Sequence, residues 1–156
     1  MIKLLRVDHR LIHGQVALTW SNALDIDCIL VANDDVVNNS IQKTTLKLAA
    51  PHNVKVVIKN IEDSIESINT GKTDKYKLLI VVQNIKDAYR LVKGVDSLNS
   101  VNLGGVKEVP GSQSLTHSVF VTEVDREYLK EMIADNVDVY AQQVPTDVKQ
   151  DIKHLM

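Results

Sequence analysis

The chain alternates short, almost uniformly apolar runs with longer segments in which apolar residues recur every three or four positions. Short runs rich in Val, Ile and Leu are typical of strands that are buried on both faces of a sheet. These runs predict strands at 2–7, 27–31, 54–58, 77–82, 100–103, 116–121 and 137–143. The segments with helical spacing predict helices at 15–24, 35–50, 61–69, 84–92 and 123–134, and a last helix from residue 147 onward.

Strands that alternate with helices indicate βαβ units, which build parallel sheets. The predicted fold class is therefore α/β: a single-domain, open, mainly parallel central sheet of about seven strands, with helices on both faces. The sequence contains no internal repeat and no linker. Residues 1–156 are accordingly predicted to form a single domain.

Composition and charge exclude several classes of protein. The 18 basic and 20 acidic residues leave a net charge of -2, which provides no overall positive field for nucleic acid or anionic lipid. No apolar run approaches the roughly 18 residues that cross a bilayer, and charged residues at the N-terminus come too early for a signal peptide. These features predict a cytoplasmic protein that has no nucleic-acid partner and reaches a membrane only through another protein. Cys28 and Trp20 are predicted to lie in the core.

Polar chemistry concentrates in the loop after the first predicted strand. Ligands of open α/β sheets bind beyond the carboxyl ends of the strands. At this end the sequence places Asp8, His9, Arg10 and His13, with Arg6 just before them. A neutral imidazole is a usable nucleophile near pH 7, and guanidinium groups bind phosphoryl oxygens with paired donors. The loop therefore indicates a phosphate or anion site.

The residues that follow this loop support the same interpretation. Gly14 lets the backbone approach a ligand closely, and the helix that begins near Gln15 presents free N–H groups and a positive dipole end. The ends of two further predicted strands contribute Asn33, Gly104 and Gly105 as candidate edges of the site.

For several of these positions a structural role stays open beside the functional one. Arg6 and Asp8 are equally suited to a structural ion pair. Asn33 could cap the next helix, and the glycine pair Gly104–Gly105 could be only a turn. His9 and His13 lie four residues apart, as in a zinc pair, but no third ligand is nearby in the sequence, so no metal is predicted.

The stretch RVDHRLIHGQV, residues 6–16, resembles the phosphorylation-site motif of a known protein family. The family is the mannose/fructose/sorbose class of IIB proteins, which belong to the bacterial phosphoenolpyruvate-dependent sugar phosphotransferase system. Its pattern is close to D-x-R-L-I-H-G-Q-V, and every fixed position is filled here. The resemblance continues in VANDDV, KLAAP, VNLGG and VPTD, at 31–36, 47–51, 101–105 and 144–147.

The resemblance implies the activity of a protein-N(pi)-phosphohistidine–sugar phosphotransferase. It implies that His13 accepts the phosphoryl group on Nδ1, that Arg10 assists the transfer, and that Arg6 and Asp8 lie in the same site. The donor would be a phosphorylated IIA domain. The acceptor would be a mannose, fructose, sorbose or amino-sugar type of sugar held in a membrane IIC/IID complex. The resemblance also implies an open α/β fold and a homodimer, and the mechanism needs no cofactor.

Two other functions stay open from the residues alone. An α/β domain that senses an anionic metabolite at the same loop would bind it reversibly and carry no covalent phosphate. A histidine phosphatase or a metal hydrolase is the other alternative, although the chain lacks both an R-H-G signature and a clustered acidic metal site.

Overall fold

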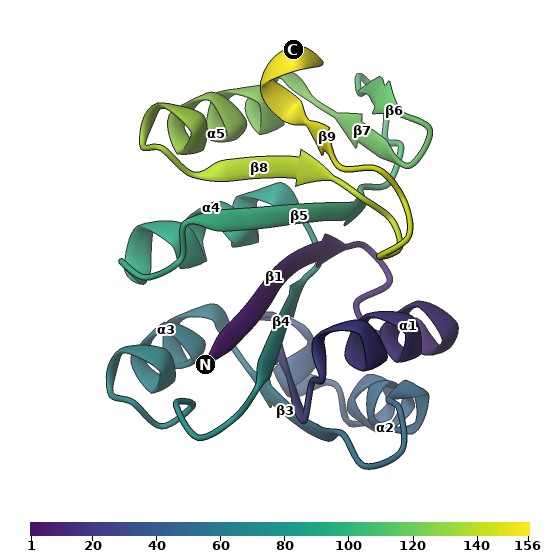
Figure 1. Cartoon of the computed structure of the whole chain (residues 1–156), viewed down its shortest axis with the longest axis vertical. Helices are drawn as coiled ribbons and strands as arrows, with labels where there is room; N and C mark the ends of the chain where they lie inside the picture. Colours follow the sequence, from purple (N-terminus) through teal and green to yellow (C-terminus); the bar gives the residue numbers. More distant parts are fainter.

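All 156 residues are described in the computed structural model, and at its centre is one seven-stranded sheet (Figure 1). Its strands are β1 Ile2–Asp8, β2 Cys28–Ala32, β3 Lys55–Lys59, β4 Leu78–Val82, β5 Ser100–Gly105, β8 Asp138–Ala141 and β9 Gln150–Asp151. The strand order is β3-β2-β4-β1-β5-β8-β9. Every pairing is parallel except that of β8 with β9, so the prediction of a mainly parallel sheet is confirmed.

Five α-helices cover the two faces of this sheet. They are α1 Gly14–Leu24, α2 Ser40–Ala49, α3 Ile61–Asn69, α4 Ile85–Gly94 and α5 Glu123–Ala134. One apolar core lies between the sheet and α1 and α2, and a larger core lies between the opposite face and α3, α4 and α5 (Figure 1). Successive residues of β2 alternate between the cores, since Leu30 belongs to the larger one and Ile29 and Val31 to the other. Cys28 and Trp20 are both buried, as predicted. The longest helix has 12 residues, and none has the length and apolar character to cross a membrane.

The prediction of one continuous strand at 116–121 is wrong, because the chain reverses there. The segment contains parts of a hairpin outside the main sheet, formed by β6 Gln113–Thr116 and β7 Val119–Val121. The turn consists of His117 and Ser118, and the backbone N–H of Ser118 donates to the Thr116 hydroxyl at 3.3 Å. Hydroxyl side chains that bond to nearby backbone favour such turns over a continuous strand. The main sheet still has seven strands, because β9 completes it.

The helix predicted from residue 147 onward is also wrong. The segment forms the short strand β9 and then a single 3₁₀ turn at Ile152–His154. The Gln142 side-chain amide donates to the carbonyl of Asp147 at 3.0 Å and to that of Pro145 at 3.2 Å. Gln150 and Asp151 pair with Ala141 and Tyr140 of β8, so the backbone of this segment is committed to the sheet instead of a helix.

The helix predicted at 35–50 is interrupted near its start. A 3₁₀ turn at Val36–Asn38 comes first, Asn39 is extended, and α2 begins at Ser40. The Asn39 side chain accepts a hydrogen bond from the backbone N–H of Gln42 at 3.0 Å. Asn is among the preferred N-cap residues because its short side chain satisfies such a free backbone donor, so a helix starts after Asn39 instead of running through it.

The sheet order brings three loops to one edge. β1 lies between β4 and β5, and β8 follows β5, with all four strands parallel. The carboxyl ends of β1, β5 and β8 are therefore neighbours. Asp8 pairs with Gly105, and Leu103 pairs with Ala141, so the loops that follow these three strands meet at the predicted site.

Replacement of the α2 cap should weaken the fold measurably. We expect Asn39→Ala to lower the free energy of unfolding by about 1 kcal/mol, because the N–H of Gln42 loses its acceptor. Asn38→Ala is the matched control: its side chain is exposed and makes no hydrogen bond, so its effect should stay within about 0.5 kcal/mol. Urea denaturation followed by circular dichroism measures both, and equal values for the two variants would contradict the assigned cap.

Candidate functional site

The carboxylate of Asp8 is the centre of the predicted site, and it is buried at the end of β1 with 1% of its side chain exposed. Arg6 Nη2 donates to its Oδ2 at 3.2 Å, and the backbone N–H of Arg10 donates to its Oδ1 at 3.0 Å. Arg10 also donates from Nε to Oδ1 and from Nη2 to Oδ2, both at 3.1 Å, in the paired geometry that a guanidinium favours. One carboxylate thus brings three of the predicted residues together.

Two opposing effects act on the ionisation of Asp8. Burial by itself raises the pKa of a carboxyl group, because the charged form loses its hydration. The hydrogen bonds from the side chain and backbone of Arg10, and the positive charges of Arg6 and Arg10, outweigh burial and hold the pKa of Asp8 below its ordinary value. Burial in turn lowers the pKa of Arg6, and the charge of Asp8 opposes that shift. The site therefore contains a carboxylate between two guanidinium groups at neutral pH.

The guanidinium of Arg6 is buried behind Asp8 and has further partners on other strands. Its Nη1 donates to Asn102 Oδ1 at 2.7 Å and to the backbone carbonyl of Gln142 at 3.2 Å. The Trp20 ring lies 5.5 Å away, within cation–π distance. Gly104 leaves room for the guanidinium, because a Cβ there would stand 2.1 Å from Arg6 Cζ. Arg6 is therefore a buried ion-pair partner that ties β1 to β5 and to the end of β8.

The loop between β1 and α1 is anchored by two apolar side chains. Leu11 and Ile12 are buried in the core between the sheet and helices α1 and α2. Leu11 has a positive φ of 61°, and its backbone N–H donates to the Asp8 carbonyl at 2.9 Å. With this turn and these anchors in place, the Arg10 side chain is 33% exposed and His13 is exposed. The loop therefore presents its polar residues to solvent while the apolar pair holds it against the sheet.

His13 occupies the N-cap position of α1. Its backbone is extended and its carbonyl accepts from the N–H of Ala17 at 2.8 Å, whereas its imidazole caps nothing. The first turn of α1 contains no acidic residue. The positive end of the helix dipole and the free N–H groups at exposed Gly14 and Gln15 therefore meet no counter-charge from their own helix. An accessible imidazole thus lies at a helix terminus that suits an anion.

The structure does not join Arg10 to His13 directly. The Arg10 guanidinium is directed back to Asp8, and no hydrogen bond links it to the imidazole. Both residues belong to the same short, anchored loop.

Asn33 lies behind the site and not on its surface. Its Oδ1 accepts from the backbone N–H groups of Asp35 and Val36 at 3.0 and 2.9 Å, which is the capping role left open by the sequence. Its amide donates to Gln83 Oε1 at 3.2 Å, and Gln83 Nε2 donates to the carbonyl of His9 at 3.5 Å. Asn33 therefore supports the loop through Gln83.

Gly105 and Gly14 have different surroundings. The Gly105 carbonyl accepts from the N–H of His9 at 3.0 Å, and a Cβ on Gly105 would make contacts of 3.4 Å with Asp8 Oδ1 and His9 Nδ1. A Cβ on Gly14 would lie 3.7 Å from the carbonyl of Ala49. Gly105 therefore borders the buried carboxylate, while Gly14 lies where α1 passes the end of α2.

Three supporting residues were missed by sequence reasoning: Asn102, Gln83 and Gln142. Asn102 is fully buried within an otherwise apolar strand, and its amide donates to the Gln142 carbonyl at 3.0 Å. Buried polar residues require hydrogen-bond partners, so an Asn inside the run SVNLGG was the available signal. Gln83 directly follows a predicted strand, so its position at the carboxyl end of the sheet was a signal, whereas nothing in the local sequence marks Gln142.

The two histidines of the loop have different surroundings. His13 is exposed, whereas His9 is half-buried, with Nδ1 shielded from solvent and without a hydrogen-bond partner. No group of three or more His, Cys, Asp or Glu side chains comes together in a way that could hold a metal ion.

Comparisons with known proteins find similar proteins that match along almost the whole chain. The model of the phosphotransferase system sorbose subfamily IIB component matches residues 2–156. A probable phosphotransferase enzyme IIB component of Streptococcus pyogenes is 34% identical over 162 residues, covering 100% of this chain and 99% of that protein. The mannose-specific EIIAB component of Escherichia coli is 33% identical over 149 residues, which are 96% of this chain and 46% of that protein. The solved IIBSor domain of the sorbose permease from Klebsiella pneumoniae aligns with a TM-score of 0.93 at 28% identity, covering 99% of this chain and 95% of that one.

Adjacent glycines provide a matched test of the space around Arg6. We expect Gly104→Ala to lower the free energy of unfolding by about 1–3 kcal/mol, because the added methyl group overlaps the buried guanidinium. Gly105→Ala meets only ordinary contacts and should cost clearly less. Thermal or urea unfolding of both variants measures the difference. A Gly104→Ala variant as stable as the wild type would show that Arg6 is not confined as described.

The contribution of Asp8 to the stability of the fold should depend on pH, because its carboxylate is held in ion pairs. Because folding lowers the pKa of Asp8, its contribution is complete above the ordinary carboxyl value of about 4 and is lost as the pH falls below it. At neutral pH we expect Asp8→Asn to cost about 3 kcal/mol, since two guanidinium groups lose their counter-charge. The difference from the wild type should shrink on acidification.

Urea denaturation between neutral and acidic pH measures this dependence. Asp96→Asn is the control, because Asp96 is exposed and has no partner, and its effect should stay within about 0.5 kcal/mol at every pH. A cost of Asp8→Asn that grew as the pH fell would contradict a lowered pKa of Asp8 in the folded protein.

Proposed function

Because the chain belongs to the sorbose subfamily of phosphotransferase system IIB components, a family that takes part in sugar phosphotransfer, we propose that it carries a phosphoryl group on His13. In this proposal His13 accepts the group from a phosphorylated IIA domain and passes it to a sugar during uptake. The observation that supports it most directly is the exposed, unpartnered imidazole of His13 at the N-terminus of α1. Residues 1–156 would act as one phosphocarrier domain.

The first step moves the phosphoryl group between two imidazoles. The neutral Nδ1 of His13 attacks phosphorus, the P–N bond to the donor histidine breaks, and the donor nitrogen keeps the electron pair and takes up a proton. The transition state spreads negative charge over three equatorial oxygens. The N–H groups at the start of α1 and the Arg10 guanidinium supply the complementary positive charge.

In the second step the acceptor is a sugar hydroxyl. Its oxygen attacks phosphorus and loses its proton, while the P–N bond to His13 breaks and the electron pair returns to the imidazole. Protonation of that imidazole favours its departure. No cofactor and no metal ion enters either step.

The remaining site residues position these groups. Asp8 holds Arg10 through two parallel hydrogen bonds, and Arg6 holds Asp8 from behind. Both act through Arg10 and are positioning residues. Gly14 and Gln15 contribute their backbone N–H groups, while Asn33, Gly104 and Gly105 keep the loop and the buried ion pairs in place.

Proteins of this class work with IIA domains and with membrane IIC/IID components. The name of the Escherichia coli relative, EIIAB, pairs a IIB component with a IIA component in one protein. For this chain we propose the same partners: a phosphorylated IIA domain as donor, and a membrane IIC/IID permease that holds the sugar. The protein would be cytoplasmic, would associate peripherally with that permease and would form a homodimer.

The phosphocarrier proposal predicts a covalent, acid-labile phosphate on one residue. After incubation with a phosphorylated IIA domain, intact-mass spectrometry should show one added phosphoryl group on the wild type and none on His13→Ala. Mild acid should remove it, because phosphohistidine has a reactive P–N bond. The control is His52→Ala, which changes an exposed histidine of another loop and should be phosphorylated like the wild type.

Two results would contradict the proposal. Full phosphorylation of His13→Ala would assign the phosphate to another residue. A wild type that binds inorganic phosphate reversibly but gains no mass would favour the anion-sensing function instead.

A further inference from the structure

A small cavity of about 160 Å³ lies on the face of the sheet that α3 covers, next to the edge strand β3 (Figure 1). Residues of β2, β3 and β4 form its floor, and its walls come from α3 and from residues 72–76, in the connection between α3 and β4. We call it the lysine pocket, because Lys55, Lys59 and Lys72 line it. We propose that the lysine pocket binds a small monocarboxylate with a short aliphatic chain.

The three lysines give the pocket a positive charge that no ion pair neutralises. No acidic side chain lines the cavity. The ammonium groups of Lys59 and Lys72 have no partner in the protein, and that of Lys55 donates only to the Tyr76 hydroxyl, at 2.9 Å. A lysine ammonium has three N–H donors and no acceptor. The pocket therefore favours a ligand that is negatively charged and accepts hydrogen bonds.

A buried hydroxyl without a partner indicates the same kind of ligand. Ser67 on α3 is 5% exposed, and its side chain lines the pocket but makes no hydrogen bond within the protein. Buried polar groups are nearly always hydrogen-bonded, so the occupant of the pocket is the natural partner of this hydroxyl. A carboxylate only accepts hydrogen bonds, and its two oxygens can accept from the hydroxyl and from the lysines together.

The floor of the pocket distinguishes a carboxylate from a compact oxyanion. It is formed by Cys28, Leu30, Val57 and Leu78, which belong to the larger core or pack against it. Phosphate has no apolar part to place on this floor. An aliphatic chain does, and each CH₂ group that it buries should strengthen binding about fourfold. Cations above an apolar floor therefore match a carboxylate that has a carbon chain.

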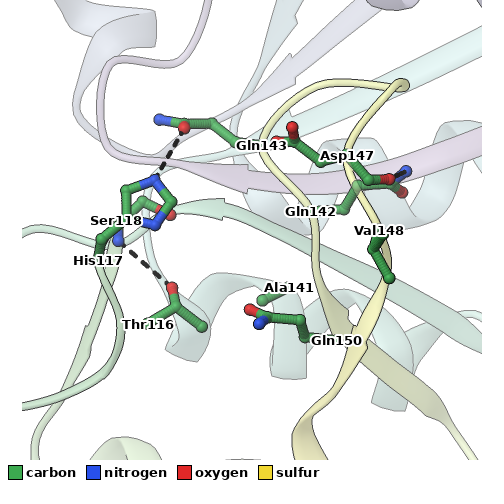
Figure 2. Close-up of a pocket in the computed structure, with 9 residues that line it drawn as sticks. All are labelled: Thr116, His117, Ser118, Ala141, Gln142, Gln143, Asp147, Val148 and Gln150. Carbon is green, nitrogen blue, oxygen red and sulfur yellow. Dashed lines mark hydrogen bonds between the residues drawn. The ribbon is translucent and has the colours of Figure 1, made fainter.

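The volume of the pocket limits the length of that chain. A cavity of about 150 Å³ holds benzene, which has about six non-hydrogen atoms. The lysine pocket is of that size, so it accommodates a carboxylate of about four carbons and is too small for a nucleotide. The cavity of about 300 Å³ between the hairpin turn and residues 147–150 is larger, but no lysine or arginine lines it (Figure 2).

The lysine pocket is preformed, because hydrogen bonds hold its floor and walls together. β2 and β3 are paired along their whole length. The backbone N–H of Lys72 donates to the Ser67 carbonyl, and that of Tyr76 donates to the Thr73 carbonyl, both at 3.0 Å. Lys55 joins β3 to the same connection through the Tyr76 hydroxyl. A preformed cavity avoids much of the ordering cost of binding.

The lysine pocket is separate from the phosphoryl site. Its floor belongs to the core under α3, α4 and α5, whereas Leu11 and Ile12, which anchor the loop of His13, belong to the core under α1 and α2. Carboxylate binding therefore does not rest on the proposed function. His13→Ala should bind the carboxylate as the wild type does, whether or not the wild type carries a phosphoryl group.

Titration of the ¹⁵N-labelled full chain with butyrate at constant ionic strength tests the proposal. Butyrate should shift the backbone amide signals of residues 55–59 and 67–76 in a saturable way. Acetate lacks two CH₂ groups and should bind about fifteenfold more weakly. Butyramide, which has nearly the same shape but no charge, and inorganic phosphate, which has no carbon chain, should both bind more weakly than butyrate.

Matched variants test which side chains hold the carboxylate. Lys72→Met should weaken butyrate binding about five- to tenfold and Ser67→Ala about fivefold, because each removes one hydrogen bond to the ligand. Lys47→Met, which removes an exposed lysine of α2, should bind like the wild type. Ser118→Ala, which removes a hydroxyl from the cavity of Figure 2, should do the same.

Three results would overturn the proposal. In the first, butyrate causes no saturable shift at residues 55–59 and 67–76, including the case in which only the loop of His13 responds. In the second, butyramide or phosphate shifts these signals as strongly as butyrate. In the third, Lys72→Met and Ser67→Ala keep the spectrum of a folded protein and bind butyrate as the wild type does.

Discussion

The site depends on one buried carboxylate held between two guanidinium groups. Removing Asp8 and Arg6 from water carries a large desolvation cost, which is offset only when both charges keep close partners and satisfied hydrogen bonds. Here the partners come from different strands: β1 supplies both charges, Asn102 belongs to β5, and the Gln142 carbonyl follows β8. All hydrogen bonds of the buried Arg6 guanidinium are therefore made only when these three strands are in register. Assembly of this end of the sheet consequently supports the carboxylate that holds Arg10.

In the β1–α1 loop, some side chains hold the loop in place and others remain accessible to a ligand or partner. Leu11 and Ile12 contribute apolar burial that keeps the loop in one conformation, while Arg10 and His13 remain accessible. An anchored loop loses little conformational freedom when a partner docks, so more of the binding energy is available for the transition state. Placing the anchors between the two polar residues also keeps the imidazole apart from the ion pair. His13 thus stays free of the hydrogen bonds that hold Arg10 to Asp8.

The parts of the structure that local chemistry specifies were predicted well. Helices α3 and α5 begin and end where expected, because Asn60 and Thr122 cap them and their apolar residues follow a helical period. The grouping of Arg6, Asp8 and Arg10 also agrees with the sequence, since these charged residues follow one another at the end of a buried strand. The errors lie where distant contacts decide. Residues 147–150 do not form the predicted helix, because Gln142 engages the carbonyl of Asp147 and Gln150 pairs with Ala141 of β8, and nothing within the segment itself reports those partners.

The charge balance of the site suits a carrier better than a tight anion receptor. Two guanidinium groups share one carboxylate, so a net positive charge of one remains beside the positive end of α1. Arg6 is buried and directed to Asp8, Asn102 and Gln142, which leaves Arg10 as the accessible cation. Arg10 is itself held by Asp8, and this competition would limit its attraction for a phosphoryl group. A residue that must receive a phosphoryl group from one protein and release it to a sugar requires attraction of that intermediate strength. A second free arginine at the loop would stabilise the phosphorylated state itself and slow the release.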